Sequence, residues 1–261
     1  SGGESWVRGR SNTDQTTRLD ELESVCRKTI EAGKRIACIE AVGGTTSNMA
    51  IDDFESIYKM REGLVKDYQL DYSPHLHADA VLGWAYLNFL DYDIDQNKLG
   101  FTEPVLMKIK KVTEKLRTLK YVDSFGVDFH KTGYMPYVSS MVMVKNKEDL
   151  GRLRRDGKIM TPLFHEHETY NPGTFSLETS RSAANILATW LTLQSIGKEG
   201  YQSLLGHSFE MSERMREKIR QHESSGIYAV NQEPYGCDIF VRCYPEGTDT
   251  SGTHARELTD D

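Results

Sequence analysis

The strongest constraint on the fold of this chain is that short apolar runs alternate with segments of helical periodicity over its first 145 residues. Residues 35–42 form one such run and end at Gly43 and Gly44, which is typical of a buried strand that enters a turn. Further strands are expected near residues 75–81, 124–129 and 139–145, and helices over residues 19–33, 52–67 and 104–120. Strands that alternate with helices predict a parallel sheet with helical crossovers, so we expect an α/β fold.

The sequence changes character after residue 145. Residues 146–172 are charged and show little periodicity, and so long a stretch is more often a functional excursion than a plain connector. A long helix is expected from about residue 182, with a break near Gly197, and a hairpin is expected over residues 226–243. An α/β part, residues 1–165, is therefore expected to precede a part made of a long helix and strands, residues 166–261.

Composition and charge indicate which kinds of molecule the protein is expected to bind and in which compartment it is expected to lie. The net charge of −7 argues against nucleic acid, because a phosphate backbone demands a basic surface. No apolar run approaches the roughly 20 residues of a membrane-spanning helix, so no membrane partner is expected. The four cysteines show neither a CxxC pair nor the spacing of a disulfide framework, which is typical of thiols in a reducing compartment. We therefore expect a cytoplasmic protein.

Reactive side chains gather on three of the predicted strands or directly after them. Thr45 and Thr46 follow the first strand, His77 and Asp79 lie on the second, and residues 123–131 cover the third and end in a lysine. Ligands of α/β sheets bind beyond the carboxyl ends of the strands. Hydroxyls, a carboxylate and an amine at neighbouring strand ends predict a cofactor pocket.

Four segments resemble motifs of the group II pyridoxal phosphate-dependent amino acid decarboxylases, a family that includes glutamate, aspartate, aromatic amino acid and diaminobutyrate decarboxylases. D-S-F-G-V-D-F-H-K at residues 123–131 is similar to the family's D-S-x-x-x-[DN]-x-H-K. H-A-D-A at residues 77–80 resembles H-V-D-A-A, and A-V-G-G-T-T at residues 41–46 resembles A-T-x-G-T-T. Residues 177–181 resemble the short S-R or G-R element that opens the family's next long helix. The four occur in the family's order, and the similarity covers nearly the whole chain.

The resemblance implies a fold-type I pyridoxal phosphate-dependent transferase-like fold. Residues 1–165 would supply the C-terminal portion of the large cofactor-binding α/β domain. Residues 166–261 would supply the long helix and the start of the small C-terminal α+β domain. The family's phosphate-binding loop and cofactor-stacking histidine precede the glycine turn, and neither is visible in the about 40 residues before it. We therefore expect a fragment that lacks the N-terminal part of a longer protein.

The catalytic roles implied by the resemblance fall on Lys131, Asp79 and His130. Lys131 would form the internal Schiff base with the cofactor aldehyde, which requires an amine that can be neutral. Asp79 would pair with the pyridine nitrogen and keep the ring protonated, so that the ring can accept electrons. His130 would lie beside the Schiff base, near the phosphate or the substrate carboxylate.

Further cofactor-binding roles are implied for two threonines, a serine and a second histidine. Thr46, with Thr45, would hydrogen-bond around Asp79 or the ring, Ser124 would donate to the phosphate, and His77 belongs to the same motif as Asp79. Asp128 stands where some members have asparagine and would add negative charge near a phosphate. The family's proton-donating loop tyrosine has no counterpart near Met160, where it would align, and Tyr170 is the nearest tyrosine.

The whole protein is expected to convert an L-amino acid, with glutamate and aspartate as candidates, to the amine and carbon dioxide as a homodimer. A lyase or transaminase of the same fold, or a non-catalytic fragment that only folds and dimerises, remains an alternative. His75 and His77, and again His165 and His167, have the alternate spacing of a strand metal site. His77 is accounted for by the family motif and the second pair lies in a polar segment, so no metal is expected.

Overall fold

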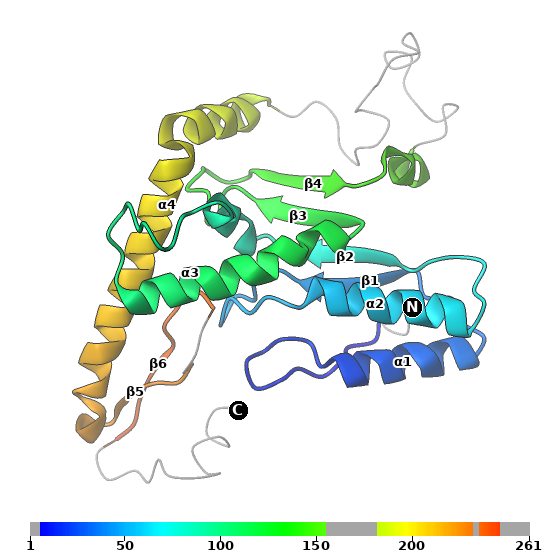
Figure 1. Cartoon of the computed structure of the whole chain (residues 1–261), viewed down its shortest axis with the longest axis horizontal. Helices are drawn as coiled ribbons and strands as arrows, with labels where there is room; N and C mark the ends of the chain where they lie inside the picture. Colours follow the sequence, from blue (N-terminus) through cyan, green and yellow to red (C-terminus); the bar gives the residue numbers. More distant parts are fainter. Residues whose placement is uncertain (1–5, 155–181, 232–234, 246–261) are drawn as a thin grey trace.

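The computed structural model describes residues 6–154, 182–231 and 235–245 (Figure 1). Several sequence predictions concern residues outside these ranges. They are the boundary between residues 165 and 166, the segment 177–181, the second histidine pair, and the proton donor near Met160 and Tyr170.

A four-stranded sheet with the strand order β1-β2-β3-β4 organises the first part of the chain. Its strands are β1 (Cys38–Val42), β2 (His75–Asp79), β3 (Ser124–Asp128) and β4 (Ser140–Val144). The first three are parallel, as predicted, whereas β4 runs antiparallel to β3. The connection between β3 and β4 contains no helix, and so short a link returns the chain only in the opposite direction.

Helices separate the strands in the predicted order. They are α1 (Leu19–Glu31), α2 (Phe54–Asp67), the 3₁₀ segment η2 (Gly83–Phe89), α3 (Glu103–Leu116), η3 (Arg117–Tyr121) and η4 (Lys147–Leu153). The helix expected over residues 104–120 is thus divided between α3 and a 3₁₀ extension. The sequence analysis did not predict η2, whose short turns carry no helical stripe long enough to recognise.

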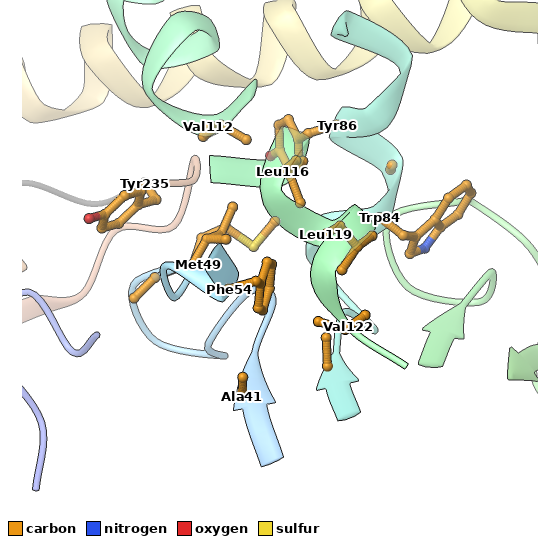
Figure 2. Packing of buried hydrophobic residues seen from close by; sticks show 14 of the residues in the cluster. Ala41, Met49, Phe54, Trp84, Tyr86, Val112, Leu116, Leu119, Val122 and Tyr235 are labelled. Carbon is orange, nitrogen blue, oxygen red and sulfur yellow. The ribbon is translucent and has the colours of Figure 1, made fainter. Parts of the chain in front are cut away.

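In the described ranges, one face of the sheet is packed against helices, and the other is not. Ile39 and Ala41 on β1 and Leu76 and Ala78 on β2 are buried, whereas the residues that alternate with them are half-buried or exposed. Side chains of α2, α3 and η3 complete this core, and Figure 2 shows Phe54, Leu116 and Leu119 above the strands. Because successive side chains of a strand point to opposite faces of the sheet, Glu40, His77 and Asp79 lie on the face opposite to this core.

The long helix α4 (Ala184–Arg220) is interrupted at Gly197, as predicted. Gly197 has φ 61° and ψ 178°, a conformation that a residue without a side chain adopts readily. Beyond this break the helix packs on the core, where Phe209 stacks on Tyr86 with ring centroids 5.2 Å apart. Before the break, its apolar side chains are largely exposed.

The chain closes with the 3₁₀ turn η8 (Glu223–Ser225) and the antiparallel pair β5 (Ile227–Ala229) and β6 (Val241–Cys243). The predicted hairpin is therefore confirmed, with shorter strands. Between these strands, Tyr235 is buried and its hydroxyl donates to Asp14 Oδ2 at 2.9 Å. None of the helices in the described ranges combines the length and the hydropathy needed to cross a membrane.

Candidate active site

Asp79 and the lysine turn meet at the carboxyl ends of β2 and β3. Asp79 pairs in register with Gly126, and Asp128 follows two residues later on the same face of β3. Lys131 lies in the turn that follows β3. A β-carbon built on Gly126 would meet His77 Nε2 at 3.9 Å and Val81 Cγ1 at 4.0 Å, which are ordinary contacts, and the glycine itself places no side chain between Asp79 and Asp128. The structure therefore brings Asp79 and Lys131, two of the three predicted catalytic residues, to one edge of the sheet.

Lys131 forms an ion pair with Asp128. Its Nζ lies 2.9 Å from Asp128 Oδ2, and the two side chains are 33% and 15% exposed. The hydroxyl of Ser140 on β4 donates to the other carboxylate oxygen at 2.5 Å. Burial raises the pKa of Asp128, but the hydrogen bonds from Lys131 and Ser140 outweigh it and hold the pKa of this carboxyl below its ordinary value. Asp128, which the sequence analysis noted only for its charge, is the lysine's partner.

His130 is held rigidly beside this pair. Its side chain is 7% exposed, and its Nδ1 lies 2.8 Å from the carbonyl oxygen and 3.1 Å from the amide nitrogen of Ser139. The ring of Tyr137 packs against the imidazole with centroids 4.1 Å apart. The other ring nitrogen, Nε2, lies 3.6 Å from Asp128 Oδ2. The imidazole is thus fixed by the backbone on one side and faces the carboxylate of the ion pair on the other.

Three side-chain hydrogen bonds join the lysine turn to distant segments and hold it in place. These hydrogen bonds run from Trp84 Nε1 to Asp128 O (2.9 Å), from Thr132 Oγ1 to Leu82 O (2.8 Å) and from Tyr201 Oη to Gly133 O (2.9 Å). Sequence analysis missed all of them, because neither the tryptophan of η2 nor the tyrosine of α4 lies near Lys131 in the sequence. The turn is therefore positioned by η2 and by α4 together.

Gly133 allows this turn to pack closely. A β-carbon at this position would lie 2.4 Å from Phe129 O and 2.7 Å from Trp84 Cζ2. The indole also contacts Phe129 edge to face, with ring centroids 5.0 Å apart. Any side chain at Gly133 would push the turn away from η2, so the glycine fixes the distance between them.

Asp79 is anchored through its own backbone and that of the neighbouring turn. Its Oδ1 accepts a hydrogen bond from the amide of Val81 at 3.2 Å, and its carbonyl accepts one from Gly43 at 2.7 Å. Gly43 in turn packs on Gly83, where a β-carbon would come within 1.9 Å of the Gly43 carbonyl oxygen. Asp79 is half-buried and lies beside Gly126 of the neighbouring strand.

The two threonines of the glycine turn have different surroundings. Thr45 Oγ1 accepts from the amide of Ala50 at 3.0 Å and lies 3.3 Å from Gln15 Oε1, so its hydroxyl is engaged within the turn. Thr46 is exposed. Within the described part of the chain, neither hydroxyl forms a hydrogen bond with Asp79. Their assignment to the cofactor stays a prediction.

Ser124 lies at the other end of β3 from Lys131. Four residues of strand separate it from Asp128, about 13 Å. Its hydroxyl lies 2.7 Å from His75 Nε2 and 2.7 Å from His77 Nδ1. The structure does not bring Ser124 together with Lys131, and the predicted phosphate contact has no support in this geometry.

His77 lies between the two ends of β2. Burial lowers the pKa of its imidazole, although the charges of Glu40 and Asp79 act in the opposite direction. Over the residues that the structure describes, no three histidine, cysteine or acidic side chains are arranged to hold a metal ion. The paired imidazoles instead share the hydroxyl of Ser124.

Asp123, the first residue of the lysine motif, has a structural position. Its Oδ2 accepts from the amide of Leu76 at 2.8 Å and pairs with the guanidinium of Arg61 on α2. Arg61 is buried and also donates to Pro74 O at 3.1 Å. This carboxylate therefore joins the start of β3 to β2 and α2.

The chain is similar to known amino acid decarboxylases. The family described as "Pyridoxal-dependent decarboxylase conserved domain" matches residues 105–237. An L-tyrosine decarboxylase of Enterococcus faecium is 28% identical over 225 residues, which are 80% of this chain and 36% of the relative. An L-2,4-diaminobutyrate decarboxylase of Acinetobacter baumannii is 24% identical over 90% of this chain and 40% of its own length. The chain thus spans about two fifths of the length of these curated relatives.

Solved structures share the fold. The crystal structure of mouse CSAD in apo form superposes with a TM-score of 0.70 at 17% identity, over 96% of this chain and 46% of that one. At that level of identity the likeness establishes the architecture, which is that of fold-type I decarboxylases.

Proposed function

The chain belongs to the pyridoxal-dependent decarboxylase family, and from this we propose that the whole protein removes carbon dioxide from an L-amino acid with pyridoxal phosphate bound through Lys131. One observation carries the proposal: the amine of Lys131 and the carboxylate of Asp79 lie at the carboxyl ends of adjacent parallel strands. Ligands of such sheets bind at this edge.

The residues at this edge fit pyridoxal phosphate in their chemistry. An aldehyde needs an amine, which Lys131 supplies, and a pyridine nitrogen needs an acidic partner, which Asp79 supplies. Gly126 lies between them and adds no side chain to the strand surface. When bound, the cofactor supplies an electron sink for the electron pair that departing carbon dioxide leaves behind.

Each residue of this chain has a distinct part in the proposal. Lys131 binds and orients the cofactor through Nζ, and Asp79 holds a proton at the ring nitrogen. His130, held by Ser139 and Tyr137, presents a fixed Nε2 at the side of the lysine. Thr45, Thr46 and Ser124 have no part that this geometry supports.

We further propose that the protein is a homodimer. Before the break at Gly197, helix α4 carries a stripe of apolar side chains that are 55–72% exposed: Ile186, Leu187, Trp190 and Leu191. Their helical spacing places them on one side, and a contiguous apolar surface of this kind is usually covered by protein. Light scattering on purified protein would test this, because a monomer at micromolar concentration would contradict it.

A cytoplasmic location is also part of the proposal. Its support is that all four cysteines are free thiols in the structure. Disulfides are rare where glutathione keeps thiols reduced. Fractionation of cells that express the protein would test this assignment, and recovery in an oxidising compartment would contradict it.

The decisive experiment traps pyridoxal phosphate covalently on the lysine of the purified chain. The purified chain is mixed with pyridoxal phosphate, its absorption spectrum is recorded, and borohydride is added before peptide mapping. An imine band with the label on Lys131, lost in Lys131→Ala and kept in the matched control Lys145→Ala, supports the proposal. Label scattered over surface lysines contradicts the role of Lys131. Analysis of the whole protein for amine and carbon dioxide then separates decarboxylation from transamination.

A further inference from the structure

We propose that Asp128 is the residue that positions Lys131, and that the contact between them masks the lysine as a nucleophile until the pair opens. The inference rests on the proposed function of Lys131 and extends it. It assigns to Asp128 the control of when the amine becomes reactive.

The first support is that the carboxylate cannot turn away from the lysine. One oxygen lies 2.9 Å from Lys131 Nζ, and the other accepts from Ser140 Oγ at 2.5 Å. The backbone carbonyl of the same residue accepts from the indole of Trp84. Because Ser140 holds the carboxylate and Trp84 holds the backbone of the same residue, Asp128 is pre-organised to receive the ammonium group.

The second support is the charge balance around the pair. The titratable groups that face it are His130, with Nε2 3.6 Å from the carboxylate, Tyr137 against that imidazole, and Asp79 at the end of the neighbouring strand. Lys131 is the closest cation to Asp128, and its side chain is two-thirds buried. Coulomb attraction between partly buried charges at this distance is much stronger than between exposed ones.

The ion pair affects the reactivity of Lys131 because an amine reacts through its free electron pair. A primary amine attacks a carbonyl only after it loses its third proton, since the ammonium nitrogen has no free electron pair. A carboxylate in contact stabilises the charged form. The pair must therefore open, or lose its carboxylate, before Lys131 reacts. Ionised Asp128 at neutral pH agrees with this, because its pKa lies below the ordinary value.

The test measures the reactivity of Lys131 without any cofactor. The chain is treated with trace acetic anhydride between pH 6 and 11, and acetylation of each lysine is followed by peptide mass spectrometry. Exposed Lys66 on α2 is the internal reference. In Asp128→Asn we expect labelling of Lys131 at pH 7.5 to be roughly 10-fold faster than in the wild type, and its rate profile to differ in shape from that of the reference lysine.

Three further variants make the result specific. Asp128→Glu keeps the charge and should keep the wild-type profile. Asp71→Asn removes an equal charge at an exposed pair with Arg35 and should leave Lys131 unchanged. Ser140→Ala frees the carboxylate without removing it, and should speed the labelling of Lys131 at pH 7.5 by a smaller factor than Asp128→Asn.

Several outcomes would overturn the proposal. An Asp128→Asn profile that coincides with wild type removes the role, and a rate lowered equally at every pH indicates a merely structural residue. If Asp128→Asn fails to fold by circular dichroism, Ser140→Ala decides by the presence or absence of its faster labelling. Because acetic anhydride needs no cofactor site, this result is independent of whether pyridoxal phosphate is trapped on Lys131.

Discussion

The two ends of the same parallel strands are organised in opposite ways. At the amino ends, polar side chains satisfy one another: Asp123 pairs with buried Arg61, and Ser124 lies between His75 and His77. At the carboxyl ends, by contrast, the carboxylate of Asp79 and the amine of Lys131 remain partly exposed at an open edge.

This difference shows that one short motif serves two purposes. The residues at the start of segment 123–131 fasten the sheet to α2, and those at its end carry the chemistry. The five residues of β3 keep the structural residues at its start apart from the reactive residues beyond its end. The comparison predicts that amino-end substitutions change stability, whereas carboxyl-end substitutions change the reactivity of Lys131.

The largest effect is expected from Asp123→Ala. It leaves the guanidinium of Arg61 buried without its carboxylate, and removing one partner of a buried pair costs about 3 kcal/mol of unfolding free energy. Urea denaturation followed by circular dichroism measures it. The control Asp71→Ala breaks an exposed pair and should cost less than about 0.5 kcal/mol. Equal losses in the two variants would remove the structural role of the amino end.

A second substitution tests whether the carboxyl end also has a structural requirement. Gly133→Ala places a methyl group 2.4 Å from the Phe129 carbonyl oxygen, and such overpacking costs about 2 kcal/mol. We expect the displaced turn to reduce borohydride trapping on Lys131 as well. Gly63→Ala on α2, where the added carbon meets nothing within 4 Å, is the matched control. Full stability in Gly133→Ala would show that the turn moves freely.

Ser124→Ala would sharpen the comparison further. Loss of the shared hydroxyl should cost about 1 kcal/mol, because two imidazoles lose a hydrogen-bonding partner. Trapping of pyridoxal phosphate on Lys131 should stay at the wild-type level. A strong loss of trapping at unchanged stability would instead restore Ser124 as a phosphate ligand, and the separation of the two ends would fail.

The smallest effect is a difference in pH dependence between the two ends. The pKa of His77 is lowered on folding, so its contribution is present above about pH 6.5 and is lost as the pH falls through the folded value. The pKa of Asp128 is also lowered, so its contribution is present above about pH 4 and is lost below it. Unfolding free energies measured from pH 8 to pH 2 should flatten near pH 6 in His77→Asn and below pH 4 in Asp128→Asn. Identical curves for both variants would contradict these assignments.

Sequence reasoning recovered the strands and helices because their signals are local. The apolar runs of β1 to β3 and the apolar stripe of α2 each lie within a short continuous segment. The break in α4 is signalled by a single residue, Gly197. Sequence reasoning also recovered the strand position of Asp79. The cofactor-binding role of Ser124 stays a prediction, and the hydrogen bonds of its hydroxyl to two histidines of the neighbouring strand became visible only in the structure.

The sequence by itself determined which residues could carry the chemistry: an amine in a lysine motif, an acid on an apolar strand, and an α/β frame to hold them. Only the tertiary structure decided that Asp128 is the partner of Lys131, that Ser140 orients this carboxylate, and that Trp84 and Tyr201 fix the turn. The physical reason is the separation along the chain between the residues that interact. Periodicity and motifs report on neighbours along the chain, whereas the ion pair and its supports depend on strand register and on a helix whose tyrosine lies 68 residues from its partner in the turn.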